Sequence, residues 1–109
     1  MATTDFLVSV VIPTYCEEQN IERCLQSIQR QVFEKGKIEI IVVDSNSPDN
    51  TRTIAQKYAD KVVHLKDRGV SKARNVGVQK AKGELLLFLD ADTILDCGFI
   101  TEIYEIFTD

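Results

Sequence analysis

The chain has 109 residues, of which 44% are hydrophobic and 28% are charged, and its formal net charge is −4. This length predicts one domain over residues 1–109, and the composition excludes an intrinsically disordered chain. The negative charge argues against a nucleic-acid-binding protein that works by neutralising phosphates. No apolar run approaches the roughly 20 residues of a membrane-spanning helix. Residues 1–6 carry no signal-peptide pattern, so we expect a cytoplasmic protein.

Four short apolar segments, rich in β-branched residues, predict strands at 7–12, 38–43, 61–65 and 84–89. The first is nearly continuous and is typical of a strand buried on both faces. We expect Pro13 to stop it. The fourth is entirely apolar after Glu84 and ends at an aspartate, Asp90.

An amphipathic helix is predicted after each strand. Asp49 or Asn50 is expected to cap the second helix, and Gly83 is expected to end the third, which begins at Ser71. The residues expected on the buried faces are, in chain order, Ile21, Cys24, Leu25, Ile28 and Val32; Ile54, Ala55 and Tyr58; Ala73, Val76, Gly77 and Ala81; and Ile100, Ile103 and Phe107.

Strands that alternate with helices predict a Rossmann-like, three-layer α/β/α fold with a mainly parallel sheet of about four strands. Ligands bind such sheets beyond the carboxyl ends of the strands. The segments to examine are therefore 14–17, 44–47, 68–74 and 90–92. The sequence contains neither a P-loop nor the glycine-rich dinucleotide-binding fingerprint, so any phosphate must be bound in another way.

Two carboxylates, Asp90 and Asp92, directly follow the fourth strand. In an extended segment, residues two apart lie on the same side. Such a pair can bind one divalent cation and leave coordination positions open for phosphate oxygens. The alternative is that the two aspartates only cap the next turn or helix.

Five other polar side chains have both a ligand-binding and a structural interpretation. Asp44 can accept hydrogen bonds from a nucleobase or a ribose, or it can form an Asx turn. Tyr15 can stack on a base or be partly buried. Glu17 can reach a ligand or only favour the start of a helix. Lys72 and Arg74 can both neutralise a diphosphate. The alternative of a solvated helix face fits Lys72 better than Arg74, because small or apolar residues surround Arg74.

The three cysteines predict neither a disulfide framework nor a zinc site, because they are odd in number and widely spaced. Cys24 is expected in the core. His64 is the only histidine and lies in a different segment from the cysteines, so a cysteine nucleophile is not predicted.

The chain resembles the N-terminal part of a family 2 glycosyltransferase of the GT-A fold. Four segments carry the resemblance in order and spacing: VSVVIPTYCE at 8–17, IIVVDSNSPDNT at 40–51, GVSKARNVG at 69–77 and GELLLFLDAD at 83–92. The resemblance implies a UDP- or GDP-sugar donor and a Mn²⁺ or Mg²⁺ ion. It also implies sugar transfer to an acceptor hydroxyl with inversion.

The resemblance also implies roles for individual residues. Asp44 matches the carboxylate that meets the base, and Arg74 matches a residue near the base or the diphosphate. Asp92 matches the metal ligand, and Asp90 matches a residue nearer the ribose that can share the metal. The loop along the nucleoside is matched by Pro13, Thr14, Tyr15 and Glu17.

The chain departs from the family pattern at two positions and in length. Cys16 stands where the family often has Asn, and Ser45 stands where it often has a second Asp. Family members usually continue for at least another hundred residues, which supply the acceptor site and a carboxylate general base. No acid near the end of this chain matches that base; the acids considered are Asp96, Glu102, Glu105 and Asp109. We therefore expect a donor-binding part that is weakly active or inactive alone.

Two other functions were weighed. A non-catalytic nucleotide- or partner-binding α/β module shares the same pattern. A phosphoacceptor receiver domain is disfavoured because its paired acids would follow the first strand, where Pro13 and Thr14 stand. Without the further hundred residues of other family members, part of the sheet would be exposed, and such a surface predicts a homodimer. A lipid acceptor would place the protein at the inner face of the membrane.

Overall fold

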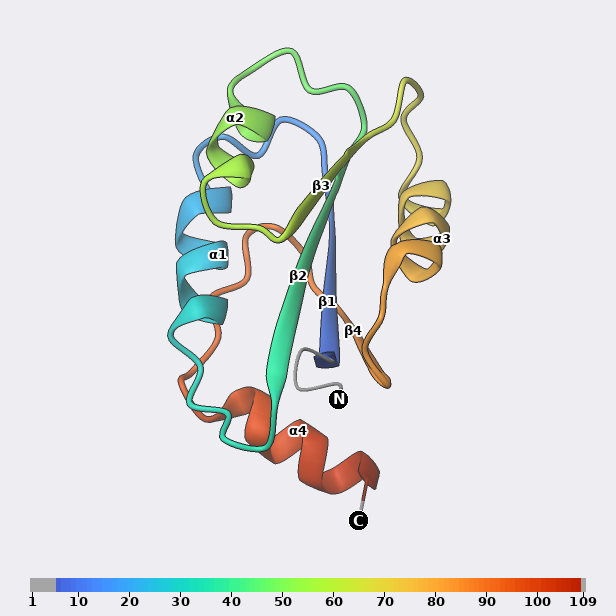
Figure 1. Cartoon of the computed structure of the whole chain (residues 1–109). Helices are drawn as coiled ribbons and strands as arrows, with labels where there is room; N and C mark the ends of the chain where they lie inside the picture. Colours follow the sequence, from blue (N-terminus) through green and yellow to red (C-terminus); the bar gives the residue numbers. More distant parts are fainter. Residues whose placement is uncertain (1–5, 109) are drawn as a thin grey trace.

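Four parallel strands form a single sheet with helices on both faces (Figure 1). The computed structural model describes residues 6–108. The strand order is β3-β2-β1-β4, so the chain builds outward from β1 and then crosses back to place β4 on the other side of β1. In chain order the elements are β1 (Phe6–Thr14), α1 (Ile21–Gln29), β2 (Lys37–Asp44), α2 (Thr51–Gln56), β3 (Lys61–His64), α3 (Val70–Lys80), β4 (Leu85–Phe88) and α4 (Phe99–Thr108). The predicted α/β fold with about four parallel strands is confirmed.

The central pair of strands forms the most buried part of the sheet. β1 pairs with β2 from Phe6–Lys37 to Thr14–Asp44, with one irregularity between Phe6 and Val8. Both strands carry runs of fully or nearly fully buried residues. This agrees with the prediction of a β-branched strand that is covered on both faces.

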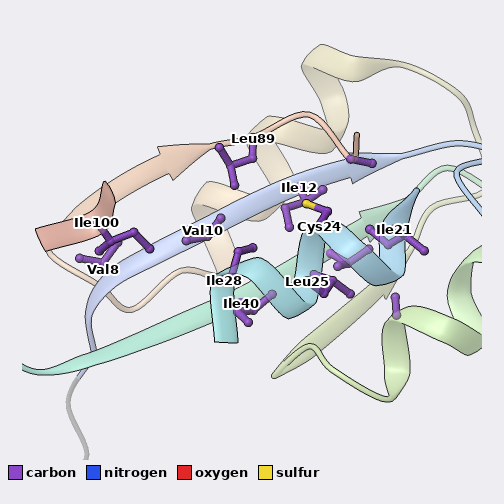
Figure 2. Close-up of a cluster of buried hydrophobic side chains, with 13 residues drawn as sticks. Val8, Val10, Ile12, Ile21, Cys24, Leu25, Ile28, Ile40, Leu89 and Ile100 are labelled. Atoms are coloured by element: carbon purple, nitrogen blue, oxygen red, sulfur yellow. The ribbon is translucent and has the colours of Figure 1, made fainter. Parts of the chain in front are cut away.

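The larger core lies between the sheet and α1 (Figure 2). Every second residue of β1, namely Val8, Val10 and Ile12, points to this side and is fully buried. Ile28 and Ile100 pack on the same cluster, so α4 covers the lower end of the face that α1 and α2 cover above (Figures 1 and 2). The helical spacing predicted for α1 is confirmed from Ile21 to Ile28.

The opposite face has a smaller core under α3, made of Val11, Ile41, Val43 and Ala73. A Cβ on Gly77 would lie 2.3 Å from a methyl carbon of Val11. Glycine therefore allows α3 to lie directly on β1.

β4 is an edge strand, and two of its side chains are only partly covered. Leu86 and Phe88 pair with Ser9 and Val11, so their side chains lie on the α3 face, where they are 37% and 41% exposed. Because α3 packs mainly on β1 and β2, the fourth strand is well covered on only one face.

Several predicted ends were wrong for tertiary reasons. Pro13 does not stop β1, which continues to Thr14. The carbonyl of Val11 accepts the Leu89 amide. Residues two apart in a strand direct their backbone groups to the same side, so the nitrogen of Pro13 also faces the β4 side. Because β4 has already ended at that level, the missing N–H of Pro13 costs no hydrogen bond between strands.

Two residues expected on buried helix faces are exposed. Val32 lies past the end of α1 and is 58% exposed, and Phe107 is 68% exposed on α4.

The third helix also ends differently from the prediction. It stops at Lys80, and Ala81 follows in an extended conformation. Gly83 is therefore not its C-terminal cap. Instead, Gly83 lies against β1, where a Cβ would be 2.7 Å from the backbone nitrogen of Ser9.

No helix among residues 6–108 is long and apolar enough to cross a lipid bilayer. The expectation of a cytoplasmic protein also depended on the N-terminal residues, of which residues 1–5 lie outside the described part of the chain.

Candidate functional site

A cavity of about 660 Å³ opens at the carboxyl edge of the sheet, where the strand order reverses between β1 and β4. Segments from four different strand ends meet there, as the α/β pattern predicts. The lining residues are Pro13, Thr14, Tyr15, Glu17, Ser45, Arg68, Gly69, Val70, Asp90, Ala91 and Asp92. This set includes six of the eight residues that the sequence analysis assigned to a donor site.

The acid pair lies on one wall of this cavity. Asp90 and Asp92 are both exposed, and within residues 6–108 neither carboxylate has a salt bridge or a side-chain hydrogen bond. The segment is not extended, because the Thr93 amide donates to the Asp90 carbonyl at 3.0 Å and closes a turn. The two aspartates line one cavity because of this turn. The prediction that they lie close together through the alternation of an extended segment was therefore wrong about the backbone conformation.

The cavity lining also carries positive charge. The Arg68 guanidinium lies over the Tyr15 ring, with its central carbon 4.1 Å from the ring centre, and this distance is typical of a cation–π contact. Gly69 and Val70 add the amino-terminal end of α3, which has a partial positive charge. Sequence analysis did not single out Arg68. The sequence feature that could have indicated Arg68 is its place directly before the glycine that precedes α3.

Asp44 was expected to contact a base, but it does not line the cavity. Its side chain is fully buried and accepts hydrogen bonds from the Thr14 hydroxyl at 2.6 Å and from the Ser47 amide at 2.8 Å and hydroxyl at 2.6 Å. Arg52 lies 3.6 Å away. The turn-forming interpretation therefore describes Asp44 in this structure, where it joins the ends of β1 and β2.

Arg74 and Lys72 also lie outside the cavity lining. The Arg74 guanidinium sits 5.9 Å from the centre of the Phe88 ring, on the exposed α3 side of β4. Lys72 is exposed and lies 3.5 Å from Asp67. For Lys72 the structure agrees with a solvated helix face.

The loop after β1 is held by the loop after β2. The Cys16 amide donates to the Ser47 hydroxyl at 2.8 Å, and the Glu17 amide donates to the Thr51 hydroxyl at 3.0 Å. Thr51 is itself held by Asp49, whose carboxylate accepts hydrogen bonds from the Thr51 amide and hydroxyl. These bonds set the position of Tyr15 and Glu17 at the cavity. The N-cap position of α2 is Asn50, which makes no side-chain capping bond.

Cys24 lies beneath the acid pair and is fully buried, as predicted. Burial raises the pKa of its thiol to about 11, and the nearby charges of Asp92 and Glu17 add to this effect. Such a thiol stays protonated at neutral pH and is a poor nucleophile. Cys16, Cys97 and His64 do not line the cavity either.

The chemistry of the acid wall fits a hard divalent cation. Asp90 and Asp92 offer carboxylate oxygens that no cation among the described residues neutralises. Residues 6–108 hold no group of three or more His, Cys, Asp or Glu side chains able to surround a metal ion. A cation held by this pair alone would keep most of its coordination positions open to oxygen ligands in the cavity.

Comparison with known proteins identifies the family. The model of the family "Glycosyl transferase family 2" matches residues 9–109. The glycosyltransferase AglE of Haloferax volcanii is 38% identical over 98 residues, which are 84% of this chain and 32% of that protein. The poly(ribitol-phosphate) β-N-acetylglucosaminyltransferase TarS of Staphylococcus aureus is 37% identical over 94 residues, which are 81% of this chain and 16% of TarS.

Solved structures agree in fold. TarS residues 1–349 in complex with UDP superpose with a TM-score of 0.84 at 34% identity, covering 92% of this chain and 31% of that one. The mannosyltransferase PcManGT of Pyrobaculum calidifontis, in complex with GDP-Man and Mn²⁺, gives a TM-score of 0.87 at 30% identity, covering 94% and 32%. The chain thus spans about a third or less of these relatives, and it belongs to glycosyltransferase family 2.

Proposed function

We propose that this domain binds a nucleotide-diphospho-sugar, with a UDP or GDP moiety, together with Mn²⁺ or Mg²⁺, as the donor half of a glycosyltransferase. The observation that carries the proposal is that two exposed carboxylates, Asp90 and Asp92, and a basic side chain, Arg68, line one cavity at the strand-order reversal. Structural relatives bound to UDP and to GDP-Man with Mn²⁺ support it.

The lining residues suit the parts of such a donor. The Tyr15 ring offers a face for a nucleobase, and Pro13 and Thr14 border it. Arg68 and the amino end of α3 supply positive charge for a diphosphate. Asp90 and Asp92 would hold the cation, and Asp90 also suits a ribose hydroxyl. A bound divalent cation supplies positive charge that offsets the charge on a departing diphosphate.

In the complete enzyme, the acceptor hydroxyl oxygen forms a bond to the anomeric carbon as the bond to the nucleoside diphosphate breaks. A base takes the hydroxyl proton, and the configuration inverts. That base is not among the acids of this chain that we considered. Asp96, Glu102 and Glu105 are outside the cavity lining, and Asp109 lies outside the described residues. The chain alone therefore binds the donor and turns it over weakly or not at all. A cytoplasmic location is also part of this proposal.

Calorimetric titration with UDP and GDP, with and without MnCl₂, tests this function. We expect Mn²⁺ to tighten the binding of at least one nucleotide. Asp92→Asn should weaken Mn²⁺-dependent binding about 10- to 100-fold, because it removes a charged ligand. Asp96→Asn is the matched control, since Asp96 is an exposed acid of the same segment outside the cavity. The proposal fails if neither nucleotide binds, or if Mn²⁺ changes neither affinity.

A further inference from the structure

The segment that carries the acid pair has no regular structure between Leu89 and Gly98, yet it is held at several points. It runs beside α1 before it enters α4 (Figure 1). The residues that hold its backbone lie on α1 and just after the end of that helix. They are Cys24, Ser27, Gln31 and Val32, which contact the backbone at Asp90, Leu95, Asp96, Cys97 and Ile100.

Ser27 is the central contact. Its side chain is buried, its hydroxyl donates to the Cys24 carbonyl at 2.7 Å, and its oxygen accepts the Leu95 amide at 3.0 Å. Leu95 follows Asp92 by three residues. A serine inside a helix is normally neutral or unfavourable, and this one uses its hydroxyl to bind the loop.

Gln31 holds the far end of the same segment. Its side-chain oxygen accepts the Ile100 amide at 2.9 Å, which fixes the first turn of α4. Its side-chain nitrogen donates to the carbonyls of Ser27 and Asp96. The amide of the next residue, Val32, donates to the Cys97 carbonyl at 2.8 Å.

We propose that Ser27 and Gln31 are positioning residues that hold the 90–100 segment so that Asp90 and Asp92 face the cavity as a preformed pair. This inference rests on the proposed function. Neither residue lines the cavity, so both act only through the loop. A pair of exposed carboxylates on an irregular segment binds a cation well only if its backbone is held by its surroundings.

The test compares Mn²⁺-dependent UDP or GDP affinity, by calorimetry, between the wild-type chain and Ser27→Ala and Gln31→Ala. We expect each variant to lose roughly 10-fold in Mn²⁺-dependent affinity, the size seen for groups that orient metal ligands. Affinity without Mn²⁺ should change much less. Ser27→Thr keeps the hydroxyl and should retain binding. Gln31→Glu keeps the acceptor for Ile100 and should fall in between, and it serves as the milder variant if Gln31→Ala does not fold.

Gln29→Ala is the matched control. Gln29 lies on the same helix and donates to the Tyr58 carbonyl, away from the acid segment. Amide hydrogen exchange gives a second measurement: exchange at Leu95 should quicken in Ser27→Ala, and exchange at Ile100 in Gln31→Ala. The inference is overturned if exchange quickens while Mn²⁺-dependent affinity stays at the wild-type value. If the wild-type chain itself shows no Mn²⁺ dependence, the proposed function fails first and this inference fails with it.

Discussion

Cys16 adopts a left-handed backbone conformation, with φ of 56°, in the loop that presents Tyr15. A side chain other than Gly, Asn or Asp pays a steric cost of about 1–2 kcal/mol there. Asn46, in the facing loop, has a similar φ of 63°. This conformation favours asparagine over cysteine at position 16.

We predict that Cys16→Asn raises the free energy of unfolding by roughly 0.5–1 kcal/mol, because asparagine tolerates this conformation better than cysteine. Urea denaturation followed by circular dichroism measures the change. Cys97→Asn is the matched control, an exposed cysteine that is not at positive φ. An equal gain in both variants would show that the removal of a thiol, not backbone strain, is responsible.

The sequence was sufficient to predict those site residues that directly follow a strand, because the ends of the strands alone decide where they lie. Tyr15 and Asp92 follow strands whose carboxyl ends must meet in any parallel sheet. Asp44 also follows a strand, but its carboxylate is taken by Thr14 and Ser47, and local spacing does not show such a contact across 30 residues. Arg68 was not singled out from the sequence because its position in the site depends on contact with the ring of Tyr15, which lies far away in sequence.

At the level of elements, a buried acid ties three segments together. Glu39 of β2 is fully buried and accepts hydrogen bonds from the Ser9 hydroxyl of β1 at 2.7 Å and from the Lys82 amide at 2.9 Å. Lys61 of β3 lies 3.0 Å from its other oxygen. Burial alone would raise the pKa of Glu39, but the bonds from Lys82, Ser9 and Lys61 outweigh it and hold the pKa below its usual value.

A carboxyl whose pKa is lower in the folded state stabilises the fold above its unfolded pKa of 4.5, and the gain is lost as the pH falls through the folded pKa. We predict that Glu39→Gln lowers stability at pH 7 by about 1–3 kcal/mol and flattens the loss of stability below pH 4.5. Denaturation curves at pH 7, 5 and 3 measure both effects. Glu34→Gln, at an exposed acid nearby, should leave the pH profile unchanged. Equal slopes for the wild type and Glu39→Gln would contradict the prediction.

The elements themselves were predictable where one periodicity extends through the whole segment, as from Ile21 to Ile28 in α1. Element ends and burial were less predictable because they depend on neighbours. The end of β4 decides that Pro13 is harmless in β1, and the position of α3 decides that Phe88 is exposed. Gly83 looks like a helix cap in the sequence, yet its place is set by contact with Ser9.

Over the whole molecule, the two faces of the sheet are covered unequally. Among residues 6–108, α1, α2 and α4 cover one face, whereas α3 alone lies on the other, mainly over β1 and β2, and leaves that face of β4 partly exposed (Figure 1). Leu86 and Phe88 lie two residues apart on that partly exposed face, beside a strand edge that pairs with no strand of the described residues 6–108. The chain spans only about a third of its relative AglE, so this surface belongs to a domain that is usually part of a larger protein.

We therefore predict that the isolated chain self-associates through the open face of β4, because exposed apolar groups beside a free strand edge favour pairing. Sedimentation velocity across a concentration series should show the average mass rising above 12.3 kDa. The double variant Leu86→Glu, Phe88→Glu should return it to the monomer value. Ile106→Glu, at a 69% exposed position of α4, is the control and should leave association unchanged. If Ile106→Glu alone abolishes association, then α4, not the sheet edge, forms the interface.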